Sequence, residues 1–373
     1  LEFRRGALPI YNMDKLFTAL LLFFAFGFLN AQTYQGLGNK NDKDNENDNP
    51  PGKVWGLVFF DYFYKTGGDS TSTALEYTGF NKDFNSFEFR RIFLGYDHNI
   101  SDDFFARFVL AYDGNDKLPN NKRAVLVKDA FLTWKEIFSL SNLTIGLQPT
   151  PSFSFETETF WGYRSIEKTS MDLRSVEFSR DLGVSLNGNF DSEKNFGYSL
   201  MVSTGTSVTS ETNKQKKIYG RLAGNFAEKK ITAAVNGDYE PFTESDKYTL
   251  SAFLGFNSGS FYAGAESFYQ ENKITSSGIS ESDPLGISLF LRGNIYKEKV
   301  KFFTRFDYYN ENSSTAQSGF NEYFVTAGIE FLPHPKIHIM PNLWLNAYSK
   351  KNENSEGRKT DVVPRITVFY DYR

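Results

Sequence analysis

The sequence predicts an all-β fold: a transmembrane antiparallel β-barrel of about 16 strands with one constriction loop folded inward. Three observations carry this prediction. The 373 residues include 39 Phe and 21 Tyr, yet the mean hydropathy is only −0.44. Apolar and polar residues alternate along most of the chain after residue 52, and an export signal precedes them. Many aromatic residues combined with low overall hydropathy are typical of a barrel in which only alternate residues meet lipid.

The start of the chain has the parts of a secretory signal peptide. Residues 13–31 contain the positive charge of Lys15, an apolar run and the small residue Ala31. A transmembrane helix is the alternative, but the apolar run is shorter than the ~20 residues that a bilayer requires. Residues 1–12 lie upstream of the expected start. The signal predicts export, with cleavage of the peptide, to the bacterial outer membrane.

The rest of the chain is expected to form one domain. Residues 32–52 are rich in Asn and Asp and cannot bury a core, so we expect a flexible polar segment there. Its acidic residues lack the glycine and terminal glutamate of a calcium-binding EF-hand loop, so no metal site is predicted. No internal linker divides residues 53–373, which we expect to form the barrel.

The period-two alternation predicts the individual strands. One face of a run is apolar, as at Ile287, Leu289 and Leu291, and the other is polar, as at Ser288 and Arg292. The expected strands are 53–66, 84–99, 102–114, 125–138, 141–149, 180–190, 195–206, 216–227, 230–240, 246–257, 259–272, 285–297, 299–310, 320–332, 335–349 and 361–373. Short turns, which suit the periplasmic side, alternate with longer polar connections such as residues 66–83, which suit the outer side, as in a barrel built from hairpins.

A soluble β-sandwich shows the same alternation, because its apolar face lines a dry core. Two features favour the membrane barrel instead. So many strands without a helical segment leave open sheet edges, which closure removes. Tyrosines also recur near the ends of the runs, where interfacial girdles of a barrel lie; they are Tyr62, Tyr64, Tyr96, Tyr112, Tyr239, Tyr308, Tyr348, Tyr370 and Tyr372.

One long stretch, residues 149–183, interrupts the alternation. It carries enough apolar side chains to pack and many charged ones, which suits a segment folded into a water-filled barrel. An outer loop closing over the barrel mouth is the alternative. The residues expected at the constriction are Phe160, Trp161, Arg164, Glu167, Lys168, Asp172, Arg174, Arg180 and Asp181.

Charged residues also fall on the polar faces of the expected strands. The residues expected to line the lumen are Arg90, Arg107, Asp113, Arg221, Arg292, Arg305 and Arg365, with acids such as Asp61, Asp129, Glu266, Asp307 and Glu330 beside them. A row of arginines favours anions, whereas mixed signs weaken that field. Solvation by channel water and pairing across strands are the alternative explanation of these charges.

The composition excludes several other functions. The chain has no cysteine, which removes thiol catalysis, disulfides and thiolate metal sites. The net charge of −4 argues against a nucleic-acid partner. The three histidines are not arranged with a serine or a second ligand for catalysis or metal binding. We therefore expect neither an enzyme nor a cofactor.

Three motifs lie around the long interruption: Ile145-Gly146-Leu147-Gln148-Pro149, the stretch WGYRSIEK from Trp161 to Lys168, and Ser179-Arg180-Asp181-Leu182-Gly183-Val184. Together they resemble the phosphate-selective porin O and P family. The resemblance implies a trimeric outer-membrane channel of sixteen strands, with an inward third loop and basic residues along the path.

Barrel size points to a pore as well, because ~16–18 strands leave an aqueous channel. The expected function is passive diffusion of small hydrophilic solutes or ions, with anions such as phosphate among them. The expected partners are outer-membrane lipid, small polar or anionic solutes and two further copies of the chain in a homotrimer. A structural or adhesive barrel with a plugged lumen is the alternative function.

Overall fold

The computed structural model describes residues 52–70, 75–114, 117–153, 155–243, 245–274, 282–313, 319–353, 355 and 357–372. The expected signal peptide, the residues upstream of it and the polar segment up to residue 51 lie outside this range. No helix among the described residues is long and apolar enough to cross a membrane.

Sixteen strands form within these residues, and every one of them matches an expected run within a few residues. They are β1 (Gly52–Tyr64), β2 (Asn85–Asn99), β3 (Phe104–Tyr112), β4 (Leu126–Phe138), β5 (Ser141–Pro149), β6 (Arg180–Asn189), β7 (Phe196–Ser203), β8 (Lys217–Phe226), β9 (Ile231–Pro241), β10 (Ser245–Asn257), β11 (Phe261–Ile274), β12 (Leu285–Tyr296), β13 (Val300–Asn310), β14 (Phe320–His334), β15 (Ile337–Lys350) and β16 (Asp361–Asp371).

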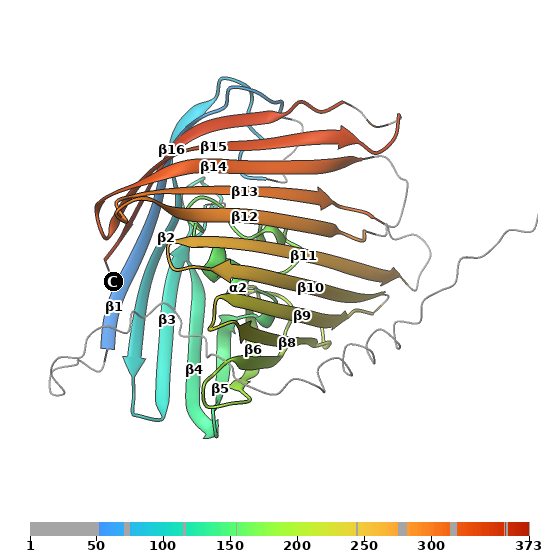
Figure 1. Cartoon of the computed structure of the whole chain (residues 1–373). Coiled ribbons are helices and arrows are strands. Elements are labelled where there is room, and N and C mark those ends of the chain that lie inside the picture. Colours follow the sequence, from blue (N-terminus) through green and yellow to red (C-terminus); the bar gives the residue numbers. More distant parts are fainter. Residues whose placement is uncertain are drawn as a thin grey trace, which may run out of the picture.

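The strands form one closed antiparallel barrel (Figure 1). Each strand pairs with its neighbours in sequence, and β1 pairs with β16 from Leu57↔Asp371 to Phe63↔Arg365. Closure leaves no strand edge without a partner, so the backbone groups of the wall are satisfied within the sheet. The predicted fold class is therefore confirmed.

The outer face of the barrel is apolar, and its inner face carries polar side chains together with clusters of aromatic ones. On β12, Ile287 and Leu289 are exposed on the outer face, while Ser288 between them is buried. On β15, Ile337 and Ile339 are exposed outward, whereas the inward Asn346 is fully buried. A soluble domain has the opposite arrangement. Of the tyrosines expected at strand ends, Tyr348 departs from the prediction: its hydroxyl donates to Asp361 on the inner side.

Two β-bulges change which side chains point inward. At the first, Phe59 pairs with Arg91 and Phe60 with Phe89, so Arg90 is the extra residue. At the second, Val109 pairs with Asp129 and Leu110 with Val127, so Lys128 is extra. A bulge places two consecutive residues opposite one. Consequently both members of each pair, Arg90–Arg91 and Lys128–Asp129, are buried inside the barrel.

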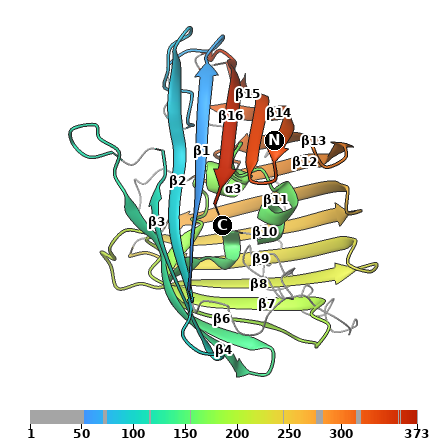
Figure 2. The ribbon, with the colours of Figure 1, turned by 90° about the vertical axis from the view of Figure 1, so that its left-hand side faces the viewer.

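The long stretch between β5 and β6 contains the helical turns η1 (Pro151–Phe153), α2 (Phe155–Trp161) and α3 (Ser170–Leu173). The expectation of a mature chain without helical segments is wrong at this place. The reason is physical: a chain inside the barrel has no neighbouring strand to pair with, and its backbone groups must find local partners. Figure 2 shows these turns within the ring of strands.

Candidate functional site: the interior of the barrel

Residues 150–153 and 155–179, called the inward segment from here on, lie inside the barrel and contact many strands. Ser152 donates to Asp238 on β9 at 3.1 Å, and Thr157 donates to Glu266 on β11 at 2.8 Å. Tyr163 donates to Glu330 on β14 at 2.7 Å. These bonds reach several sides of the wall, so the segment is an inward-folded loop and not a cover over the mouth.

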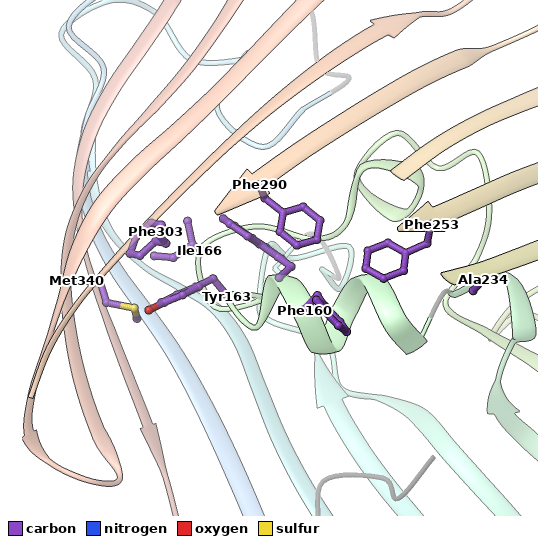
Figure 3. Close-up of a cluster of buried hydrophobic side chains, with 9 residues drawn as sticks. Phe160, Tyr163, Ile166, Ala234, Phe253, Phe290, Phe303 and Met340 are labelled. Carbon is purple, nitrogen blue, oxygen red and sulfur yellow. The ribbon is translucent and has the colours of Figure 1, made fainter. Parts of the chain in front are cut away.

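Aromatic packing anchors the middle of the segment (Figure 3). Phe160 packs edge-to-face on Phe253 of β10, with ring centroids 5.2 Å apart. Trp161 is fully buried and lies 5.7 Å from the ring of Phe290 on β12. These two residues, which were expected at the constriction, fasten the segment to the wall. The remaining members of the cluster are Tyr163, Ile166, Ala234, Phe303 and Met340.

Four of the expected lumen arginines bind backbone carbonyls of the segment. Arg90 donates to the oxygens of Ser165 at 2.8 Å and Ile166 at 2.7 Å, and Arg365 donates to Ile166 at 2.7 Å. Arg292 donates to the oxygen of Phe160 at 2.6 Å, and Arg305 donates to that of Lys168. Buried carbonyls need donors, and a segment without a pairing strand must obtain them from side chains.

Carboxylates neutralise most of the arginines that were expected to line the lumen. Arg305 donates to both oxygens of Asp307, Arg221 donates to Glu156, and Arg107 donates to Asp97 at 2.7 Å. A buried charge without a counter-charge is costly, so pairing is expected on physical grounds. Among the described arginines, Arg292 alone has no carboxylate within 4.0 Å; its guanidinium lies 3.8 Å from the ring centre of Tyr262.

Several expected constriction residues belong to buried polar clusters. Arg174 has a side chain that is 2% exposed, and it donates to Glu322 on β14 at 2.5 Å. Arg180 pairs with Asp129. Asp181 is fully buried and accepts hydrogen bonds from Ser203, Thr204, the backbone of Gly205 and Tyr219. Arg180 and Asp181 lie on β6 and not in the inward segment.

Glu167 is another buried member of the segment. Its carboxylate accepts from Trp344 at 3.0 Å, while its backbone oxygen accepts from Trp161 at 2.9 Å. Burial by itself raises the pKa of Glu167, but the guanidinium groups of Arg90 and Arg365 outweigh it, so the pKa is lowered. The carboxylate is therefore held ionised at the centre of the barrel.

A cavity of about 120 Å³ remains beside the inward segment. Seven of its eleven lining residues are charged, unlike the aromatic cluster described above. The lining residues are Leu75, Glu76, Arg90, Arg91, Asp113, Gly114, Glu167, Lys168, Asp172, Leu173 and Ser175. Five of the residues that the sequence predicted at the constriction or in the lumen line this open space: Arg90, Asp113, Glu167, Lys168 and Asp172.

The charges around this cavity form a network. Asp113 accepts from Arg91 at 2.7 Å and Lys128 at 3.1 Å, and Arg164 donates to Asp172 at 2.6 Å. Burial raises the pKa of Asp113, but Arg91 and Lys128 more than reverse this, and the pKa lies well below its usual value. Burial likewise raises the pKa of Asp172, whereas Arg164 and Lys168 lower it to about 2. Both carboxylates are ionised at neutral pH.

Lys168 is the least restrained charge of this lining. Its ammonium group is 4.0 Å from Asp172, and 28% of its side chain is exposed, more than for any other charged residue that lines the cavity. Arg164, by contrast, is held between Glu158 and Asp172 and over the ring of Phe153. A solute in the cavity therefore meets Lys168 as its most accessible cation.

Sequence reasoning missed Arg91, Lys128 and Glu76 as lining or network residues. Arg91 and Lys128 point inward only because of the bulges, and no period-two pattern contains that information. Glu76 lies in the connection over residues 66–83, which was expected on the outer side of the membrane and was assigned no part in the lumen. No group of three or more His, Cys, Asp or Glu within the described residues has an arrangement able to hold a metal ion.

Comparison with solved structures places the fold among outer-membrane proteins. The outer-membrane channel DcaP of Acinetobacter baumannii superposes with a TM-score of 0.64 at 12% identity, covering 86% of this chain and 97% of that one. An anion-selective porin from Comamonas acidovorans gives 0.59 at 10% identity, with coverages of 86% and 99%. OmpF of Salmonella typhi, in complex with daunomycin, gives 0.62 at 9% identity, with 86% and 97%.

No protein-family model matches the sequence, and a search of curated proteins found no significant match. At identities of 12% or less, the structural similarity concerns the fold alone. The chain is thus similar in fold to outer-membrane porins and channels.

Proposed function

We propose that this protein is an outer-membrane porin through which small hydrophilic solutes or ions diffuse passively, without catalysis. The observation that carries the proposal is the reversed polarity of a closed barrel, with exposed Leu and Ile side chains outside and ionised side chains inside. The outer face suits acyl chains, and the inner face suits water and polar solutes.

The charged cavity beside the inward segment is the proposed constriction. Its wall carries three cations and four acids, so opposite signs nearly balance; they are Arg90, Arg91, Lys168, Glu76, Asp113, Glu167 and Asp172. Because Lys168 is the most exposed of them, we expect a modest preference for anions, phosphate included, and not strict exclusion of cations.

Further parts of the proposal come from the sequence. The signal peptide over residues 13–31 supports export with cleavage, and the motif from Trp161 to Lys168 supports the phosphate-selective porin O and P family. That resemblance also favours a homotrimer in contact with outer-membrane lipid. The anion-selective porin among the structural neighbours is compatible with these points.

Single-channel recording of the refolded protein in planar lipid bilayers tests the proposal. A steady ohmic current with a reversal potential displaced toward that of chloride supports an anion-preferring porin. A steady current with no displacement supports an unselective porin. Absence of current from a correctly folded barrel would instead favour the plugged structural barrel, a candidate supported by the aromatic cluster around Trp161.

A further inference from the structure

We infer that two loops bound the constriction, and that residues 75–84, called the first loop here, form its second wall through Leu75 and Glu76. This inference rests on the proposed pore function and adds a size- and charge-determining element to it. The connection between β1 and β2 was expected at the outer side of the barrel. The structure instead folds the first loop into the lumen.

The first loop packs into the barrel as firmly as the inward segment does. Leu75 and Tyr77 are buried in an apolar cluster, and Leu173 of the inward segment packs against the same cluster. The ring of Tyr77 lies 5.3 Å from that of Trp344 in an edge-to-face arrangement. The other members come from four strands; they are Phe63, Phe324, Trp344 and Val363. A loop tip exposed to bulk water would not bury these side chains.

A buried lysine holds the course of the loop. Lys65, at the end of β1, is fully buried, and its ammonium group pairs with Asp361 at 2.6 Å. It also donates to the backbone oxygens of Asp69 at 2.7 Å, Tyr77 at 3.1 Å and Phe80 at 2.7 Å. A buried ammonium must keep such partners because its desolvation is costly. The lysine thereby ties the first loop, through Tyr77 and Phe80, to the end of β1 and to Asp361 of β16.

The first loop also positions the inward segment. The carboxylate of Glu76 accepts from Arg90 Nε at 2.8 Å and Nη2 at 2.7 Å. The hydroxyl of Tyr77 donates to Asp61 at 2.9 Å and accepts from Arg365 at 2.8 Å. Arg90 and Arg365 are the two arginines that bind the carbonyls of Ser165 and Ile166. The two loops are therefore joined through shared guanidinium groups.

The cavity lies between the two loops and the wall. Leu75 and Glu76 contribute one side, and the part of the inward segment from Glu167 to Ser175 contributes another. Arg91 and Asp113 close the third side. The space of about 120 Å³ corresponds to only a few water molecules of ~30 Å³ each. The side chain of Glu76 is 24% exposed, so a solute in this space meets its carboxylate as well as Lys168.

The experiment uses the absence of cysteine from the chain, because any introduced thiol is then unique. Glu76→Cys is compared with Lys168→Cys on the inward segment and with Ser210→Cys in the exposed connection between β7 and β8. Each refolded full-length variant is recorded in a planar bilayer before and after addition of trimethylammonium-ethyl methanethiosulfonate. The group that the reagent adds is comparable in volume to the cavity. We therefore expect the conductance of Glu76→Cys and Lys168→Cys to fall by about twofold or more.

Ser210→Cys is expected to keep its conductance after the reagent. If the reagent lowers the conductance of Lys168→Cys but not that of Glu76→Cys or Leu75→Cys, the first loop does not form a wall of the constriction. The proposed pore function is unaffected by that result. Leu75→Cys is included because the loss of the Glu76–Arg90 pair can impair refolding. Absence of current from the unsubstituted protein would overturn the proposed function, and the inference with it.

Discussion

Replacing Lys168 by glutamine removes the most exposed charge of the proposed constriction while keeping a side chain of similar length. Its ammonium group lies 4.0 Å from Asp172, a long and partly exposed ion pair that adds little to stability. The substitution therefore changes the field in the cavity with little effect on the scaffold. We expect the pore to lose its preference for anions in this variant.

The size of the effect follows from Coulomb's law. An anion that passes about 5 Å from the ammonium group is stabilised by ~0.8 kcal/mol if the surroundings behave as water and by ~3 kcal/mol at an effective dielectric constant of about 20, and a cation is destabilised by the same amount. The smaller value corresponds to a change of about fourfold in the local ion concentration. Because cations change by a similar factor in the opposite direction, the anion-to-cation permeability ratio of Lys168→Gln should fall by about sixteenfold or more.

The measurement is the reversal potential under a salt gradient, with ionic strengths of about 0.1 M so that the screening length stays near 10 Å. Lys216→Gln is the matched control: its side chain is 46% exposed and pairs with Glu211 outside the cavity. An unchanged permeability ratio in Lys168→Gln, at unchanged conductance, would refute the assignment of the constriction. Neutralising Arg174 is expected to leave selectivity unchanged, because its guanidinium is buried against Glu322.

Three further predictions concern the anchoring of the inward segment. Trp161→Ala should destabilise the segment by about 3–5 kcal/mol and raise the current noise, because it empties a fully buried site. Trp161→Phe should destabilise the segment less. Equal noise in both variants and the unsubstituted protein would argue against anchoring by this side chain. Gly162→Ala should lower the thermal midpoint, because φ is +67° and the added Cβ would lie 2.9 Å from Arg292 Cζ; an unchanged midpoint contradicts this. The depressed pKa of Asp172 contributes about 2 kcal/mol of stability above pH ~4, which is lost as the pH falls through about 2; an acid unfolding curve of Asp172→Asn that matches the unsubstituted protein would exclude that contribution.

The barrel could be predicted from the sequence because its information is local. A strand with one lipid-like and one polar face shows period two along a few residues, as from Ile287 to Arg292, and the short hairpin turns are local too. The interruption over residues 149–183 was also visible in the sequence. Closure follows from these elements, since sixteen strands with one apolar face leave no other way to satisfy every edge.

The partners of the lumen charges could not be predicted in this way. Arg365 binds the carbonyl of Ile166 across 199 positions of sequence, and Arg90 binds the first loop and the inward segment together. Most of the arginines expected to line the lumen instead anchor the inward segment or pair with carboxylates. Only some of the residues expected at the constriction face the cavity. Alternation predicts that a residue lies on the inner face, but it does not predict which residues that side chain contacts there.

The sequence alone thus determined the closed wall and its two faces, because hydrophobic periodicity and turn chemistry act between near neighbours in the chain. Only the tertiary structure decided where space remains inside. The two bulges place Arg91 and Lys128 on the inner face, and the contacts of Lys65 hold the first loop in the lumen. Such placements depend on desolvated charges finding counter-charges on distant strands, and that choice exists only once the barrel has closed.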